Sequence, residues 1–78
     1  MVAFTRGRAR GGKLTDRELE VLALLAGGLS TPEIAGQLGI APATVKTHLT
    51  STYRKLGAKN RVQAVRYYLD HLRGRAAG

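Results

Sequence analysis

Apolar residues recur three or four positions apart in four stretches of the chain, a spacing that places side chains on one face of an α-helix. No stretch shows the strict alternation of apolar and polar residues that is typical of a half-buried strand. The pattern therefore predicts an all-α fold of four short helices, at about residues 16–26, 31–38, 42–56 and 61–72.

Polar residues and glycines mark the expected ends of these helices. In a capping box, a polar residue before the helix and a residue three positions later satisfy each other's backbone N–H groups. Three pairs have this spacing: Thr15 with Glu18, Ser30 with Glu33, and Asn60 with Gln63. Gly39 and Gly57 follow the second and third helices, where a left-handed backbone ends a helix without strain.

The second and third helices have the spacing of a helix-turn-helix. If Thr31 is position one, Ala35 is fifth, Gly39 ninth and Val45 fifteenth. A small Ala35 allows the two helices to cross closely, and Gly39 supplies the turn. We expect the inward-facing residues to be Ile34, Leu38, Ile40, Val45 and Leu49. In such a unit the second helix, here residues 42–56, presents its outer face to the major groove of DNA.

Helical geometry divides residues 42–56 into two faces. The packing face carries Val45, Leu49, Thr52 and Leu56, and the opposite face carries Lys46, Thr47, Thr50 and Arg54. Lysine can donate to guanine O6 and N7, while threonine offers a hydroxyl group to a base edge and a methyl group to thymine. We predict base contacts at Lys46, Thr47 and Thr50; without the turn spacing, the same residues would indicate only a solvated helix face.

Phosphate contacts are expected at helix starts, where free N–H groups and the helix dipole attract anions, and at flanking cations. The candidate residues are Ser30, Thr31, Thr44, Arg54 and Lys55. Ser30 has an equally good interpretation as a simple helix cap. The basic side chains could equally be solvated.

Composition and charge agree with a nucleic-acid partner. The chain has 78 residues, room for one domain, and a net charge of +8. Residues 1–13 carry +4, residues 14–40 carry −3, and residues 41–78 set eight basic groups against Asp70. The predicted recognition helix thus lies in the basic part, as expected of a protein that displaces counterions from phosphates.

The same composition divides the chain into a domain and two flanking segments. Residues 14–73 form the domain, and residues 74–78 are expected to be a disordered tail. Residues 1–13, rich in glycine and arginine, indicate a flexible basic arm or linker. Arg6, Arg8 and Arg10 could instead enter the minor groove, which composition favours less than a linker.

Catalytic, metal and membrane functions find no support in these residues. Cysteine is absent, His48 and His71 lie on different helices, and the few acidic residues form no paired carboxylates. The chain also lacks a secretory segment and any apolar run that could span a bilayer. We therefore expect a cytoplasmic protein, located at the nucleoid, that is not an enzyme and binds no cofactor, metal or small molecule.

Six short strings occur together and in order: LTDRE at 14–18, GLS at 28–30, EIA at 33–35, TVKTH at 44–48, KLG at 55–57 and NR at 60–61. From Leu14 to about Val65 the chain resembles the DNA-binding domain of the LuxR family of bacterial transcription regulators. The resemblance implies binding to promoter DNA as a homodimer, with base contacts at Lys46, Thr47 and Thr50. It also implies a dimer contact on the last helix, which we assign to Val62, Val65, Tyr68 and Leu69.

Two residues depart from the family pattern. Ala41 stands where a serine or threonine usually caps the recognition helix, and Thr52 stands where a larger aliphatic residue is usual. We expect a lost cap at the first position and a thinner core at the second.

Members of this family usually carry an upstream regulatory domain, so the chain is expected to be the C-terminal output domain of a larger regulator, with a short stand-alone form as the alternative. A different alternative for its function is an RNA-polymerase-binding or protein-interaction module built on the same fold. Loss of DNA affinity in a Lys46→Ala variant would favour a DNA-binding regulator over a protein-interaction module.

Overall fold

The structure is a computed structural model that describes residues 13–74. Within this range it contains α2 (Asp16–Ala26), α3 (Thr31–Leu38), α4 (Pro42–Leu56) and α5 (Arg61–Tyr67), followed by a π-helical segment, η1 (Tyr68–Leu72). The described residues include no strand, so the all-α prediction is confirmed. Residues 1–12, with the predicted basic arm, and residues 75–78 of the predicted tail lie outside the described range.

The last helix differs from its prediction, because the single helix expected over residues 61–72 changes character at Tyr68. The backbone N–H of Arg73 donates to the carbonyl of Tyr68, five residues earlier, which is the π-helical pattern. Since a π turn winds more slowly than an α turn, the three- and four-residue spacing no longer defines one face across it. Ala64 and Tyr68 are buried, whereas Leu69 is 45% exposed.

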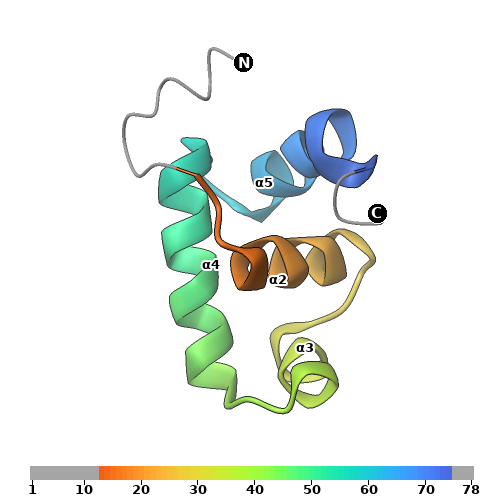
Figure 1. Cartoon of the computed structure of the whole chain (residues 1–78), viewed down its shortest axis with the longest axis vertical. Coiled ribbons are helices and arrows are strands. Elements are labelled where there is room, and N and C mark those ends of the chain that lie inside the picture. The colour runs from red at the N-terminus through yellow and green to blue at the C-terminus, as the bar shows by residue number, and fades with distance from the viewer. Residues whose placement is uncertain (1–12, 75–78) are drawn as a thin grey trace.

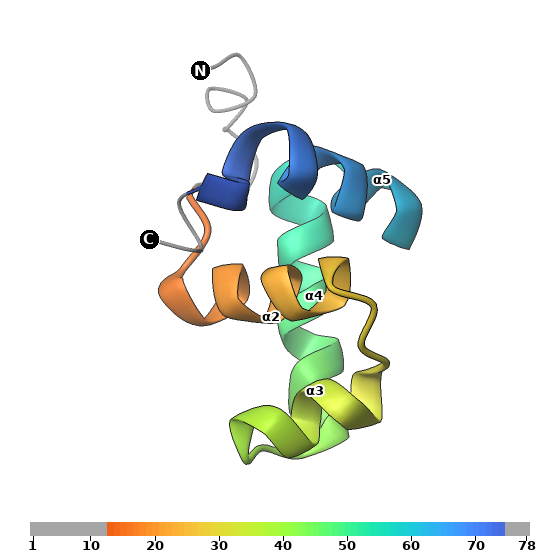
Figure 2. The ribbon, with the colours of Figure 1, turned by 90° about the vertical axis from the view of Figure 1, so that its right-hand side faces the viewer.

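The longest helix is α4, and the other described helices lie along it (Figure 1). In Figure 1, α2 lies beside the middle of α4, α3 near its beginning and α5 near its end. Figure 2 shows the same order from the side, with α2 between α3 and the α5–η1 segment. The described helices α2, α3 and α5 therefore all lie on one side of α4.

The core joins α2, α3 and α4 through side chains from the predicted apolar faces. Val21, Leu22, Ile34 and Val45 are fully buried, and Leu25, Leu49 and Leu56 are nearly so. Thr52 is also fully buried, and its hydroxyl donates to the carbonyl of His48 at 2.7 Å. This hydrogen bond satisfies the polar group that replaces the expected aliphatic side chain, at the cost of apolar volume in the core.

Two of the predicted capping boxes are confirmed and the third is altered. At α2, Thr15 Oγ1 accepts from Glu18 N at 3.0 Å and Glu18 Oε1 accepts from Thr15 N at 2.9 Å. Ser30 and Glu33 form the same reciprocal pair at α3. At α5, Asn60 caps the helix as expected, but Gln63 accepts from the N–H of Lys59 rather than from that of Asn60.

None of the described helices combines the length and apolar character required to cross a bilayer.

Candidate nucleic-acid interface

The turn between α3 and α4 is built as the helix-turn-helix spacing predicts. Gly39 has φ 67° and ψ 35°, a left-handed conformation that a residue with a Cβ adopts only at a cost. The N–H groups of Gly39 and Ile40 both donate to the carbonyl of Ala35, which closes α3. Ala35 itself is only 4% exposed, as expected of a small residue where two helices meet.

The outer face of α4 is exposed and carries the predicted base-reading residues. Lys46, Thr47, Thr50 and Arg54 are all exposed, opposite the buried stripe that faces α2 and α3. Within residues 13–74, neither Lys46 nor Arg54 has an acidic partner. The long side of α4 that carries this face is not covered by any other described helix (Figure 1).

The two exposed threonines of this face differ in their hydrogen bonding. Thr47 Oγ1 donates to the carbonyl of Ala43, one turn earlier, at 3.1 Å. Among the residues that the structure describes, the hydroxyl of Thr50 has no hydrogen-bond partner. The two side chains are chemically identical but differ in whether the hydroxyl proton is already donated within the helix.

Both helix starts near this face carry hydroxyl groups. Ser30 is exposed and caps α3, so its structural function is established, while Thr31 is half-buried. At α4 the cap residue is Ala41, which provides no side-chain hydrogen bond, as its departure from the family pattern predicts. Thr44, in the first turn of α4, is exposed. Among residues 13–74, the N-terminus of α4 therefore has no side-chain cap.

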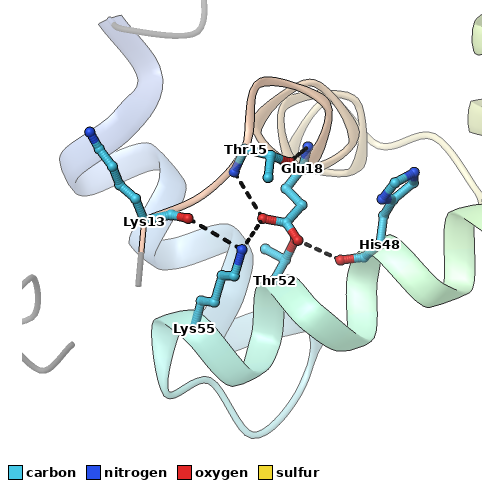
Figure 3. A network of polar contacts seen from close by, with 6 residues as sticks. All are labelled: Lys13, Thr15, Glu18, His48, Thr52 and Lys55. Atoms are coloured by element: carbon cyan, nitrogen blue, oxygen red, sulfur yellow. Dashed lines mark hydrogen bonds and ion pairs between the residues drawn. The ribbon is translucent and has the colours of Figure 1, made fainter. Parts of the chain in front are cut away.

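Lys55, a predicted phosphate contact, lies in a different environment from Arg54. Its Nζ lies 2.8 Å from Glu18 Oε1 and donates to the backbone carbonyl of Lys13 at 3.2 Å (Figure 3). The side chains of Lys55 and Glu18 are only 13% and 6% exposed. The ammonium group thus binds α2 and the residue before it, a geometry that favours a structural function.

The carboxyl group of Glu18 is held in its charged form by this network. Burial alone would raise its pKa, but hydrogen bonds from Lys55, the Thr15 backbone and Ser51 outweigh burial and hold the pKa below its ordinary value. The sequence prediction identified Glu18 only as a capping residue and missed the ion pair. One signal was available, because Glu18 precedes the buried Val21 and Leu22 at helical spacing and so shares their face.

The four predicted dimer contacts do not share one environment. Val62 is 70% exposed and Leu69 is 45% exposed, whereas Val65 is half-buried. Tyr68 is 7% exposed and belongs to the core. Val62, Val65 and Leu69 line a shallow groove with Leu25 at the end of α2, so three of the four lie together.

His48 is half-buried at the edge of the packing face of α4. Among the described residues, no group of three or more His, Cys, Asp or Glu side chains is placed to hold a metal ion.

Comparison with known proteins agrees with this geometry. Residues 12–68 match the model of the family described as bacterial regulatory proteins, luxR family. A similar solved structure is the phage VqmA–DPO complex, with a TM-score of 0.72 and 30% sequence identity. The alignment covers 85% of this chain but only 29% of the VqmA chain. Because the family model spans most of the chain, and the helix-turn-helix lies within the match, the chain belongs to the LuxR family of DNA-binding transcription regulators.

Proposed function

We propose that this domain recognises a specific sequence in double-stranded DNA by placing the outer face of α4 in the major groove. The observation that carries the proposal is this face itself, which is polar, exposed and free of acidic partners within residues 13–74. An α-helix fits the width of the major groove, and only there do base edges present a unique pattern of donors and acceptors. Lys46, Thr47 and Thr50 make the base contacts.

Contacts to the DNA backbone set the position of α4. Thr44 and the N-terminus of α4 face one phosphate, because the positive end of the helix dipole attracts anions. Ser30, Thr31 and Arg54 supply further contacts. Lys55 is left out of this set, since its ammonium group already pairs with Glu18.

The domain acts as a dimer on a two-fold DNA site. Val62 and Leu69 are the large apolar side chains most exposed in the described part of the chain, and Val65 lies beside them. A symmetric contact between two copies would cover this surface, and dimers of helix-turn-helix proteins read half-sites about one helical turn apart. Tyr68 supports the surface from within the core.

The domain serves as the DNA-binding output part of a larger regulator. It corresponds to 29% of the length of the VqmA chain that it resembles, which leaves most of that protein for other functions. The signal to which such a regulator responds would act through the rest of the protein.

Lys46→Ala tests the proposal, with Arg17→Ala as the matched control. Both variants remove one positive charge, but Arg17 lies on α2, where it pairs with Glu20, away from the outer face of α4. We expect Lys46→Ala to cost about 1–3 kcal/mol of binding free energy on a selected duplex and to relax its specificity. Fluorescence anisotropy at two salt concentrations measures this, because a pure charge effect would weaken both variants alike.

Equal affinity of the wild type and Lys46→Ala would contradict the assignment of α4 as the base-reading helix. It would favour the alternative, a protein-interaction module on the same fold.

A further inference from the structure

We propose that Thr47 and Thr50 read DNA by different chemistry: Thr47 presents its methyl group to a thymine, and Thr50 donates its hydroxyl proton to a base acceptor. This assignment rests on the DNA-binding function proposed above. It concerns which bases the face selects, since a methyl group contacts only the C5-methyl of thymine, whereas a hydroxyl proton can be donated to an acceptor on guanine, adenine or thymine.

The hydrogen bond inside α4 restricts what Thr47 can offer. Its hydroxyl proton is donated to the carbonyl of Ala43 at 3.1 Å, so this proton is not available to a base without breaking that bond. Threonine in a helix frequently makes this bond to the residue four positions earlier, which competes with external partners. Thr47 therefore enters the groove with its donor already used.

The same hydrogen bond also fixes the methyl group of Thr47. The hydroxyl and methyl groups share Cβ, and rotation about χ1 moves them together among three staggered positions. Holding Oγ1 toward Ala43 thus holds Cγ2 in one place on an exposed helix face. A preorganised methyl group makes an apolar contact without further loss of side-chain freedom.

Thr50 lies one turn later on the same exposed face, but its hydroxyl proton is not donated within the helix. Within residues 13–74 its hydroxyl has no hydrogen-bond partner, so its proton remains available. Adjacent positions of the face thus combine an apolar reader with a polar one, and Lys46 adds a cationic donor for guanine.

The test uses duplexes that the intact chain selects from a random pool, with each thymine of the selected site replaced in turn by deoxyuridine. This replacement removes only the C5-methyl group. At one thymine per half-site we expect about a fourfold loss of affinity for the wild type, the value of one apolar carbon removed from a contact. Thr47→Val, which keeps the methyl group, should show the same loss, and Thr47→Ser, which lacks it, should show none.

At Thr50, the hydroxyl group and not the methyl group should determine the affinity of the matched variants. Thr50→Ser keeps the hydroxyl and should bind within about twofold of the wild type, whereas Thr50→Val should bind about tenfold more weakly, the value of one lost hydrogen bond with its acceptor left unpaired. We expect all four variants to fold, because serine and valine differ little from threonine in helix propensity. Thermal unfolding of each variant checks this.

The proposal is overturned if no thymine is sensitive to the replacement, or if Thr47→Val weakens binding while Thr47→Ser does not. The second pattern would assign the hydroxyl of Thr47 to the base. These outcomes leave the DNA-binding function intact, since all of them require a selected site. Failure of the wild type to retain any duplex would overturn both proposals.

Discussion

At the residue scale, Glu18 and Lys55 connect the start of α2 to the last turn of the proposed recognition helix. Glu18 accepts from the Thr15 backbone and from Lys55, and Lys55 also binds the carbonyl of Lys13 (Figure 3). One carboxylate thereby caps α2 and pairs with one of the cations of α4, Lys55. A buried pair of this kind costs desolvation when it forms, but removal of one partner leaves the other charge buried and unpaired.

We expect Glu18→Gln to lower the free energy of unfolding by about 3 kcal/mol at neutral pH, the usual cost of breaking a buried ion pair. Because the pKa of Glu18 is lowered in the folded protein, its stabilising effect is present above the ordinary pKa of glutamate and is lost as pH falls through the lowered value. The difference between variant and wild type should therefore shrink toward acidic pH. Urea unfolding at a series of pH values measures it.

Two further variants control this experiment. Glu20→Gln removes an exposed carboxylate that lies 3.5 Å from Arg17, and it should change stability by less than about 1 kcal/mol. Replacing the whole pair, as Glu18→Gln with Lys55→Met, should restore part of the lost stability because no unpaired charge remains. A difference that stays constant with pH would exclude titration of Glu18 as the cause.

The capping function of Glu18 could be predicted from the sequence, and its ion pair could not. A capping box is local, so Thr15 and Glu18 specify it within four residues. The partner on α4 lies 37 positions away, and its choice depends on how α2 crosses α4. Lys55 and Arg54 are neighbours with similar charge, and only the packing of α4 distinguishes the cation bound inside from the exposed one.

At the element scale, α4 begins without a side-chain cap, although it is the helix on which the proposed function depends. Ala41 has the extended backbone of a cap residue, φ −73° and ψ 148°, but no side-chain oxygen, and only its carbonyl accepts from the N–H groups of Thr44 and Val45. α2 and α3 each begin with a complete capping box. Of these three helix starts, only that of α4 is not stabilised by a side-chain capping hydrogen bond.

Ala41→Ser should raise the free energy of unfolding by about 1 kcal/mol, because it supplies the missing acceptor on a backbone that is already in the cap conformation. Chemical denaturation measures the gain. Ser30→Ala, which removes the corresponding oxygen at α3, should cost a similar amount. An unchanged stability of Ala41→Ser would mean that the bond from the Thr44 N–H to the Ala41 carbonyl already satisfies the first turn, so that a side-chain cap adds nothing.

The first three described helices could be predicted with their bounds. Capping boxes begin α2 and α3, Pro42 begins α4, and a glycine follows each of the three. The last could be predicted only as a helix. Its change to π-helical winding at Tyr68 follows no local signal that we can identify, and it coincides with the burial of Tyr68 in the core. That burial also explains why the predicted dimer contact at Tyr68 does not lie on the surface.

At the scale of the whole molecule, the fold separates two surfaces. α2, α3 and α5 lie on one side of α4, so its polar face is directed away from them (Figures 1 and 2). Val62 and Leu69 form an apolar surface on the α5–η1 segment. The proposed DNA-reading face and the proposed dimer surface thus lie on different elements, as a two-fold reader requires.

Val62→Glu should prevent self-association without unfolding the domain, because Val62 is 70% exposed and a symmetric contact would bring two carboxylates into an apolar interface. Sedimentation equilibrium, with and without DNA, measures the oligomeric state. Gln63→Glu adds the same charge at the next position and keeps the Oε1 acceptor for the Lys59 N–H. Identical association of the wild type and Val62→Glu would contradict a dimer through this surface.

The exposed face of α4 could be predicted residue by residue, because the periodicity of the helix alone separates Lys46, Thr47 and Thr50 from the buried stripe. The identity of the DNA site could not, since it depends on how α4 is oriented in the groove and on the spacing of two copies.

Selection of duplexes from a random pool, at low and at near-physiological salt, tests the central claim most directly. A sequence-specific dimer should retain a recurring two-fold motif, with half-sites separated by about one helical turn or a simple multiple of it, at both salt concentrations. Retention that disappears with added salt and yields no motif would show only binding to the DNA backbone. That result, or no retention at all, would contradict a sequence-specific reader.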